Sequence, residues 1–155
     1  MPLLLVLLLA AITSAQRPTD IVRWSASVPS KPVAAGGTAK IELTAKIEDG
    51  WKLYALVQPK GGPVALEIAL DKGTPFRLVQ KQITGTLPKV MKDDTFNVDT
   101  QYYEHEAAFT VPVTVPKTAA GKQQVPIDVT FQACGATICL RPFTQRINVD
   151  ISVSR

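Results

Sequence analysis

The strongest indication of the fold is the segment Val129-Thr130-Phe131-Gln132-Ala133-Cys134-Gly135-Ala136-Thr137-Ile138-Cys139-Leu140-Arg141-Pro142-Phe143, which holds the only two cysteines of the 155-residue chain. Apolar residues alternate with polar ones before the first cysteine, and a similar alternation resumes over residues 143–153. A period of two is typical of half-buried strands. The segment therefore predicts a hairpin in which Cys134 and Cys139 face each other, where Cα atoms about 4.5–5.5 Å apart allow a disulfide.

The purpose of this bridge stays open on spacing alone. A disulfide that closes so short a loop stabilises a fold by roughly 2 kcal/mol, against about 4–5 kcal/mol for a loop of around 100 residues. A purely structural bridge would therefore be more effective between distant strands. Many secreted domains nevertheless carry short hairpin disulfides, so a redox pair and a structural staple are both compatible with Cys134 and Cys139.

The remainder of the chain after residue 20 has the pattern of an all-β protein. Residues 38–48 alternate most clearly, with Ile41, Leu43, Ala45 and Ile47 on the inward face, and Asp49-Gly50 is a tight-turn signal. Further strands are expected at residues 21–27, 64–70, 75–82 and 102–115, with turn regions at residues 28–37 and 117–123. About eight short strands without a helical pattern predict a two-sheet β-sandwich.

The domain organisation is simple. Residues 3–12 are apolar and are followed by the small residues Thr13-Ser14-Ala15, a run shorter than the roughly 20 residues of a membrane span. We expect residues 1–15 to be a secretory signal peptide and residues 16–155 to form one domain, with no stable membrane insertion once the leader is removed. The alternative is that the apolar run is an uncleaved anchor. The expected location is periplasmic or secreted, where disulfides persist.

Charge and composition argue against two other classes of function. The net charge is +4, but the basic residues are scattered rather than clustered, so no nucleic-acid partner is expected. His105 is the only histidine, and a metal site normally needs more ligands at a suitable spacing, so no metal site is expected. The distant alternative is a copper site of Cys134, Cys139, His105 and Met91, because sulfur ligands suit Cu(I).

The cysteine segment resembles the active-site hairpin of the amino-terminal domain of DsbD, the bacterial thiol:disulfide interchange protein. That family has Tyr/Phe-Gln-x-Cys, a short turn, and then Cys, an apolar residue and proline, similar to Phe131-Gln132-Ala133-Cys134 and Cys139-Leu140-Arg141-Pro142 here. Asp49-Gly50-Trp51-Lys52-Leu53-Tyr54 is similar to a second family motif. Asp94-Thr95-Phe96 resembles the family's cap loop, although Thr95 replaces an acidic residue and Arg141 replaces one of two prolines.

The resemblance implies an immunoglobulin-like fold and a role for each candidate site residue. Cys139 would be the attacking thiol and Cys134 the resolving one. Phe96 would cover the disulfide as part of a cap loop, in a stretch, residues 85–101, that lacks a strand period. Asp94 would hydrogen-bond a thiol or raise its pKa by repulsion. The plain alternatives are a loop aromatic packed on the core and a solvated carboxylate.

Two tyrosines and the partners complete the expectation. Tyr54 and Tyr103 are candidates for the surface around the disulfide, with packing on the sheet as the equal alternative. The chain would be an exported domain that passes reducing equivalents to or from other periplasmic proteins, without a cofactor. Its partners would be thioredoxin-fold periplasmic proteins or a separately encoded membrane thiol reductase. The alternative is a non-catalytic β-sandwich that binds proteins and uses the bridge as a staple.

Overall fold

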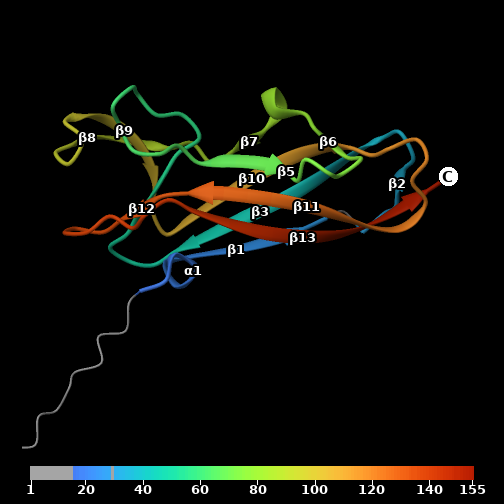
Figure 1. Ribbon diagram of the computed structural model, residues 1–155, viewed down its shortest axis with the longest axis horizontal. Coiled ribbons are helices and arrows are strands. Elements are labelled where there is room, and N and C mark those ends of the chain that lie inside the picture. Colours follow the sequence, from blue (N-terminus) through green and yellow to red (C-terminus); the bar gives the residue numbers. More distant parts are fainter. Residues whose placement is uncertain (1–15, 29) are drawn as a thin grey trace, which may run out of the picture.

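The computed structural model describes residues 16–28 and 30–155, and it consists of thirteen strands, one short α-helix and one short 3₁₀ helix (Figure 1). The expected signal peptide lies outside the described residues. Helix α1 (Pro18–Ile21) has a proline in its first turn and leads directly into the first strand. No helix in the described part of the chain has the length and apolarity needed to cross a bilayer.

Two sheets form the body of the domain. The first contains β1 (Val22–Ser27), β3 (Thr38–Ile47), β10 (Glu106–Thr114) and β6 (Arg77–Leu78) in that order, with β7 (Thr84–Gly85) also paired to β10. The second contains β2 (Val33–Ala34), β13 (Phe143–Ser154), β11 (Gly121–Phe131) and β5 (Glu67–Leu70). All of these pairs are antiparallel except β2 with β13.

The core lies between these two sheets and follows from the alternation in their long strands. Each inward position is fully or almost fully buried, as at Ile41 and Leu43 in β3 and Ile127 and Val129 in β11. Burial of one such side chain contributes about 1.5–3 kcal/mol. The Trp24 ring lies 6.0 Å from the rings of both Phe109 in the first sheet and Phe131 in the second. The predicted two-sheet sandwich is confirmed.

A third sheet, which was not predicted, extends one end of the sandwich. Its order is β12 (Ala133–Cys134), β4 (Lys52–Tyr54), β9 (Val98–Tyr103) and β8 (Lys89–Asp93). In Figure 1 it lies at the end opposite to the C-terminus. The prediction that residues 85–101 lack strands is therefore wrong. Strand β8 shows no apolar alternation because most of its side chains are exposed. It is a strand because it pairs with β9, not because one of its faces is buried.

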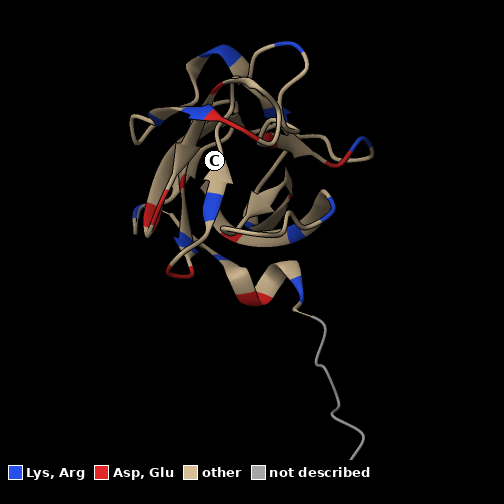
Figure 2. Cartoon of the chain, turned by 90° about the vertical axis from the view of Figure 1, so that its left-hand side faces the viewer, with Lys and Arg blue, Asp and Glu red and all other residues tan. Residues whose placement is uncertain are grey.

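Smaller corrections concern strand lengths. Residues 102–115 were expected as one strand, but β9 ends at Tyr103 and β10 begins at Glu106, because the chain turns at His105, whose φ is 63°. Strands β5 and β6 are shorter than predicted, and the 3₁₀ helix η1 (Gln80–Gln82) occupies the end of the second of these segments. Strand β11 begins at Gly121, inside the expected turn region. Figure 2 shows positive and negative residues spread over this view of the domain.

Candidate functional site

The disulfide lies at the edge of the third sheet. After Phe131 the chain leaves the second sheet, and β12 pairs with β4 so that Ala133 faces Leu53 and Cys134 faces Lys52. Cys134 is bonded to Cys139, with their Cα atoms 4.0 Å apart in an isolated antiparallel bridge. Cys134 is 5% exposed, whereas Cys139 is partly exposed. The predicted pairing of the two cysteines across a tight hairpin is therefore present, and Cys139 is the more exposed residue of the pair.

Backbone hydrogen bonds close this hairpin independently of the disulfide. The Gly135 amide donates to the Ile138 carbonyl at 2.8 Å, and the Leu140 amide donates to the Ala133 carbonyl at 2.9 Å. The two bonds flank the sulfur bridge. The turn is therefore closed by main-chain bonds as well as by the covalent link.

Gln132 fixes the hairpin to the neighbouring loop. Its Nε2 donates to the Leu140 carbonyl at 3.2 Å, and its Oε1 accepts from the Val64 amide at 2.9 Å. The Trp51 ring lies against Gly135, since a Cβ added at Gly135 would stand 3.5 Å from three atoms of the ring. Gln132 and Trp51 belong to the two matched motifs, but no role was predicted for either side chain.

One face of the third sheet collects the side chains around Cys134. Residues that face each other in an antiparallel pair share one face, as do residues two apart on a strand. Cys134 faces Lys52, and Tyr54 faces Tyr102. The result is a pocket of about 220 Å³ beside the disulfide, lined by Lys52, Tyr54, Met91, Lys92, Asp93, Asp94, Thr95, Cys134, Gly135 and Ala136.

A buried carboxylate, which the sequence analysis missed, organises this pocket. Asp93 is 4% exposed and accepts hydrogen bonds from the Tyr54 hydroxyl at 2.7 Å, the Thr95 amide at 3.0 Å and the Thr100 hydroxyl at 3.3 Å. Burial, together with the bond to Asp93, raises the pKa of the Tyr54 phenol. The predicted acidic residue, Asp94, is exposed, although it also lines the pocket beside Cys134. Recognition of β8 as a strand would have been the signal for an inward-facing Asp93.

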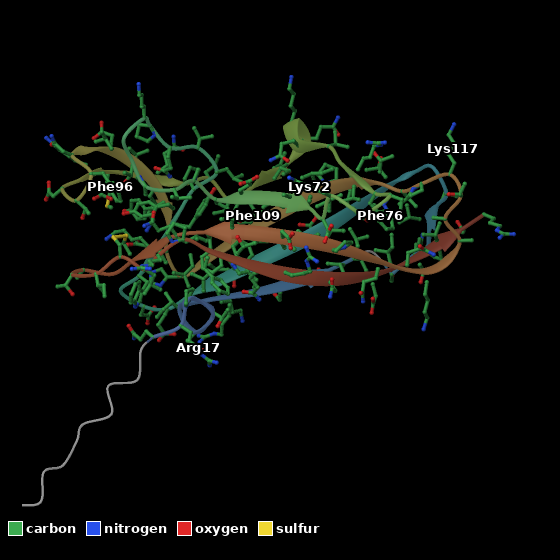
Figure 3. The ribbon with its side chains drawn as sticks, in the orientation of Figure 1. Arg17, Lys72, Phe76, Phe96, Phe109 and Lys117 are labelled. Atoms are coloured by element: carbon green, nitrogen blue, oxygen red, sulfur yellow. A yellow bond between two sulfur atoms is a disulfide. The ribbon has the colours of Figure 1, made fainter. Side chains whose placement is uncertain are left out.

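Phe96 lies in the turn between β8 and β9. Its ring meets Tyr54 edge-on with a centroid distance of 5.9 Å, and Figure 3 places it at the same end of the molecule as the third sheet. Asn97 has a φ of 55° and its amide donates to the Asp93 carbonyl at 2.7 Å, which tightens the turn. The expected cap loop is thus a β-hairpin, and Phe96 approaches the pocket through its contact with Tyr54.

Tyr103 and His105 are not brought to the pocket. Tyr103 faces Leu53, is 4% exposed and packs edge-on against Phe109 in the core at 5.5 Å. Burial raises the pKa of the Tyr103 phenol. His105 lies in the turn before β10, where its Nδ1 is 3.1 Å from Asp49 Oδ1. Among the described residues, no three or more His, Cys, Asp or Glu side chains gather in a way that suits a metal ion.

Comparisons with known proteins agree with this geometry. A family model described as the N-terminal domain of the thiol:disulfide interchange protein DsbD matches residues 23–151. The structure is similar to the DsbD N-terminal domain of Neisseria meningitidis in its reduced form, with a TM-score of 0.56 and 18% identity over 88% of this chain and 90% of that one. A search of curated proteins finds no match.

A second solved structure supports the same fold. The N-terminal periplasmic domain of ScsB from Proteus mirabilis has a TM-score of 0.58 and 18% identity, over 89% of this chain and 49% of that one. At this identity the two structures establish the sandwich fold, while the family model covers most of the sequence. The chain therefore belongs to the family of DsbD N-terminal domains, and it is a thiol:disulfide interchange domain with its disulfide between Cys134 and Cys139.

Proposed function

We propose that this domain is exported and exchanges disulfides with other periplasmic proteins through Cys134 and Cys139. The observation that carries the proposal is a partly exposed disulfide in a turn that backbone hydrogen bonds already close. A bridge in that position adds little to the order of the hairpin, and the partial exposure of Cys139 offers a partner an approach to it. Dithiol exchange requires this combination of pairing and access.

The unequal exposure of the two cysteines supports the proposal that Cys139 is the attacked sulfur and Cys134 the resolving one. A partner thiolate attacks Sγ of Cys139, a partner–Cys139 disulfide forms, and the Cys134–Cys139 bond breaks with its electron pair left on Cys134. A second partner thiolate then attacks the partner sulfur and releases Cys139, while solvent protonates the two thiolates of the domain. The reverse sequence oxidises the domain, and the reduction potentials of the two partners set the direction.

The β8–β9 hairpin acts as the cap in this proposal. Phe96 packs on Tyr54, and Tyr54 lines the pocket beside Cys134, so a partner that approaches from this side displaces the hairpin. Asp93 holds the base of the hairpin through its three hydrogen bonds. Asp94 at the pocket rim disfavours a thiolate by repulsion. Tyr103 packs in the core on the other face of the sheet and does not contact the partner in this proposal.

The partners are thioredoxin-fold periplasmic proteins or a separately encoded membrane thiol reductase. The sulfur pair is the redox group, so the exchange requires no cofactor. A periplasmic location is supported by the description of the ScsB structure as a periplasmic domain and by the apolar run in residues 3–12. Residues 1–15 act as the signal peptide of a mature domain over residues 16–155, and N-terminal sequencing of the exported protein tests this cleavage. An unprocessed N-terminus would contradict it.

The equilibrium of the Cys134–Cys139 bridge with glutathione tests the proposed function. Free thiols are alkylated at a series of ratios of reduced to oxidised glutathione, and the reduced fraction of the domain is measured by mass spectrometry. Exchange proteins lie at roughly −120 to −270 mV, whereas structural bridges usually lie below about −300 mV. A potential in the upper range supports exchange. A potential below −300 mV on the same scale would overturn it in favour of a protein-binding sandwich with a structural staple.

A further inference from the structure

Lys52 is the charged residue placed most directly against the disulfide. It stands opposite Cys134 in the β4–β12 pair, and both residues line the pocket beside the bridge. Facing residues in an antiparallel pair have Cβ atoms about 4.5–5.5 Å apart, within the reach of a lysine side chain. The register thus puts a flexible cation beside the less exposed of the two sulfurs.

In the disulfide form the ammonium group points away from the sulfur. Lys52 Nζ lies 5.6 Å from the ring centroid of Tyr102, which is on β9, on the other side of β4 from Cys134. No carboxylate of the described residues lies within ion-pair distance of Lys52. Lys52 and Tyr102 are both partly exposed, and a cation–π contact at such a site is worth only about 0.5–1 kcal/mol, so the flexible four-carbon stem can leave it. The charge is therefore available when a negative sulfur appears.

We propose that Lys52 turns from Tyr102 to the Cys134 thiolate during exchange and stabilises this sulfur as the leaving and resolving group. This inference rests on the proposed function. When a partner thiolate attacks Cys139, the electron pair of the broken bond stays on Cys134. A leaving thiol of lower pKa departs faster, and a neighbouring ammonium group lowers that pKa. In the reverse direction, the same cation raises the fraction of Cys134 present as the attacking thiolate.

The other charged groups around the pocket do not replace Lys52. They are Lys92, Asp93 and Asp94 from β8 and its turn, with Tyr54 as the remaining titratable side chain. Asp93 is already engaged by three donors, one of which is Tyr54. The exposed Asp94 opposes a thiolate. Lys52 is the cation on the strand paired with Cys134, so its charge offsets the carboxylates.

The test measures the pKa of the Cys134 thiol in a Cys139→Ser variant, by the absorbance of the thiolate near 240 nm against pH. Adding Lys52→Met is expected to lower the thiolate fraction at pH 7 by about 3- to 10-fold, and Lys52→Arg is expected to preserve it. Lys89→Met is the matched control, because Lys89 lies opposite Tyr102 on the same sheet face. Three strand spacings, roughly 14 Å, separate it from Cys134, beyond the screening length.

A kinetic measurement on the chain with both cysteines separates this inference from the proposed function. Lys52→Met is expected to slow reduction by glutathione about 3- to 10-fold, with Lys89→Met unchanged. Far-UV circular dichroism confirms folding, and Lys52→Gln serves if Lys52→Met unfolds. If folded Lys52 variants leave the pKa of the Cys134 thiol and the rate of disulfide reduction unchanged, or if Lys89→Met has an equal effect, the role of Lys52 would be overturned. The proposed exchange function would be unaffected by that result. If Lys52→Met lowers the thiolate fraction and the reduction rate as expected, but the reduction potential of the wild-type disulfide lies below about −300 mV, the proposed function alone would be overturned.

Discussion

The Tyr54 hydroxyl donates a 2.7 Å hydrogen bond to Asp93 Oδ2, and this bond joins the strand beside the disulfide to the base of the cap hairpin. Both residues are almost completely buried. The Tyr54 and Phe96 rings also meet edge to face, and the Asp93 carboxylate accepts a hydrogen bond from the Thr95 amide in the turn that carries Phe96. The position of the β8–β9 turn relative to β4 thus depends on a polar contact between residues 39 positions apart in the chain.

Replacement of Tyr54 by phenylalanine is expected to loosen the cap while keeping the ring. The buried Asp93 carboxylate loses its shortest hydrogen bond, at a cost of about 1–3 kcal/mol in the free energy of unfolding. Reduction of the disulfide by small thiols should accelerate at the same time. Urea unfolding and thiol release measure the two effects. Equal stability and equal reduction rate in the variant and the wild type would contradict the latch.

Alkaline pH should weaken the same contact. Burial and the bond to Asp93 raise the pKa of Tyr54 in the folded state, while an unfolded tyrosine titrates near 10. A raised folded pKa gives stability that is complete below pH 10 and is lost as pH rises further, by up to about 1.4 kcal/mol per pH unit. The wild type and Tyr54→Phe should therefore show parallel stability up to pH 9, and a steeper decline of the wild type above pH 10. Parallel curves throughout would contradict the linkage.

Removal of the Phe96 ring should open the cap without touching the sulfur pair. An aromatic pair contributes about 0.5–1.5 kcal/mol, so Phe96→Ala is expected to raise the open fraction and the rate of reduction by small thiols about 2- to 10-fold. Leu87→Ala is the control, because Leu87 is an 88% exposed apolar residue just before β8. An unchanged rate in Phe96→Ala, or the same acceleration in Leu87→Ala, would reject the cap role.

The sequence predicted those strands in which burial of one face produces an alternation of apolar and polar residues. Ile41 and Leu43 alternate with charged residues, and so they indicated the sandwich. The hairpin around Cys134 and Cys139 followed from alternation on both sides. Strand β8 was not predicted, because it is defined by its pairing with β9 and has no apolar face that the sequence could reveal. The buried position of Asp93 was not predicted either, since its partner in the structure, Tyr54, lies 39 residues earlier in the chain.

The placement of Lys52 opposite Cys134 could not be predicted either, because it follows from the strand register alone. Residues 51–56 offered two competing core faces in the sequence, and both are largely buried in the structure. Leu53 packs in the sandwich core, while Tyr54 points to the pocket. A segment buried on both faces has no alternation from which to read the side of each residue.

Single cysteine variants should separate the two sulfurs by their exposure. Cys139 is partly exposed and Cys134 is 5% exposed, so a partner sulfur reaches Cys139 first. In Cys134→Ser the Cys139 thiolate attacks the disulfide of an oxidised thioredoxin-fold partner and displaces one partner sulfur as a thiolate. The domain then has no second thiol to resolve the mixed disulfide, so a stable complex should accumulate. Cys139→Ser should form little complex, because its remaining cysteine, Cys134, is only 5% exposed. Non-reducing electrophoresis measures both, and a stable complex with Cys139→Ser alone would reverse the assigned roles.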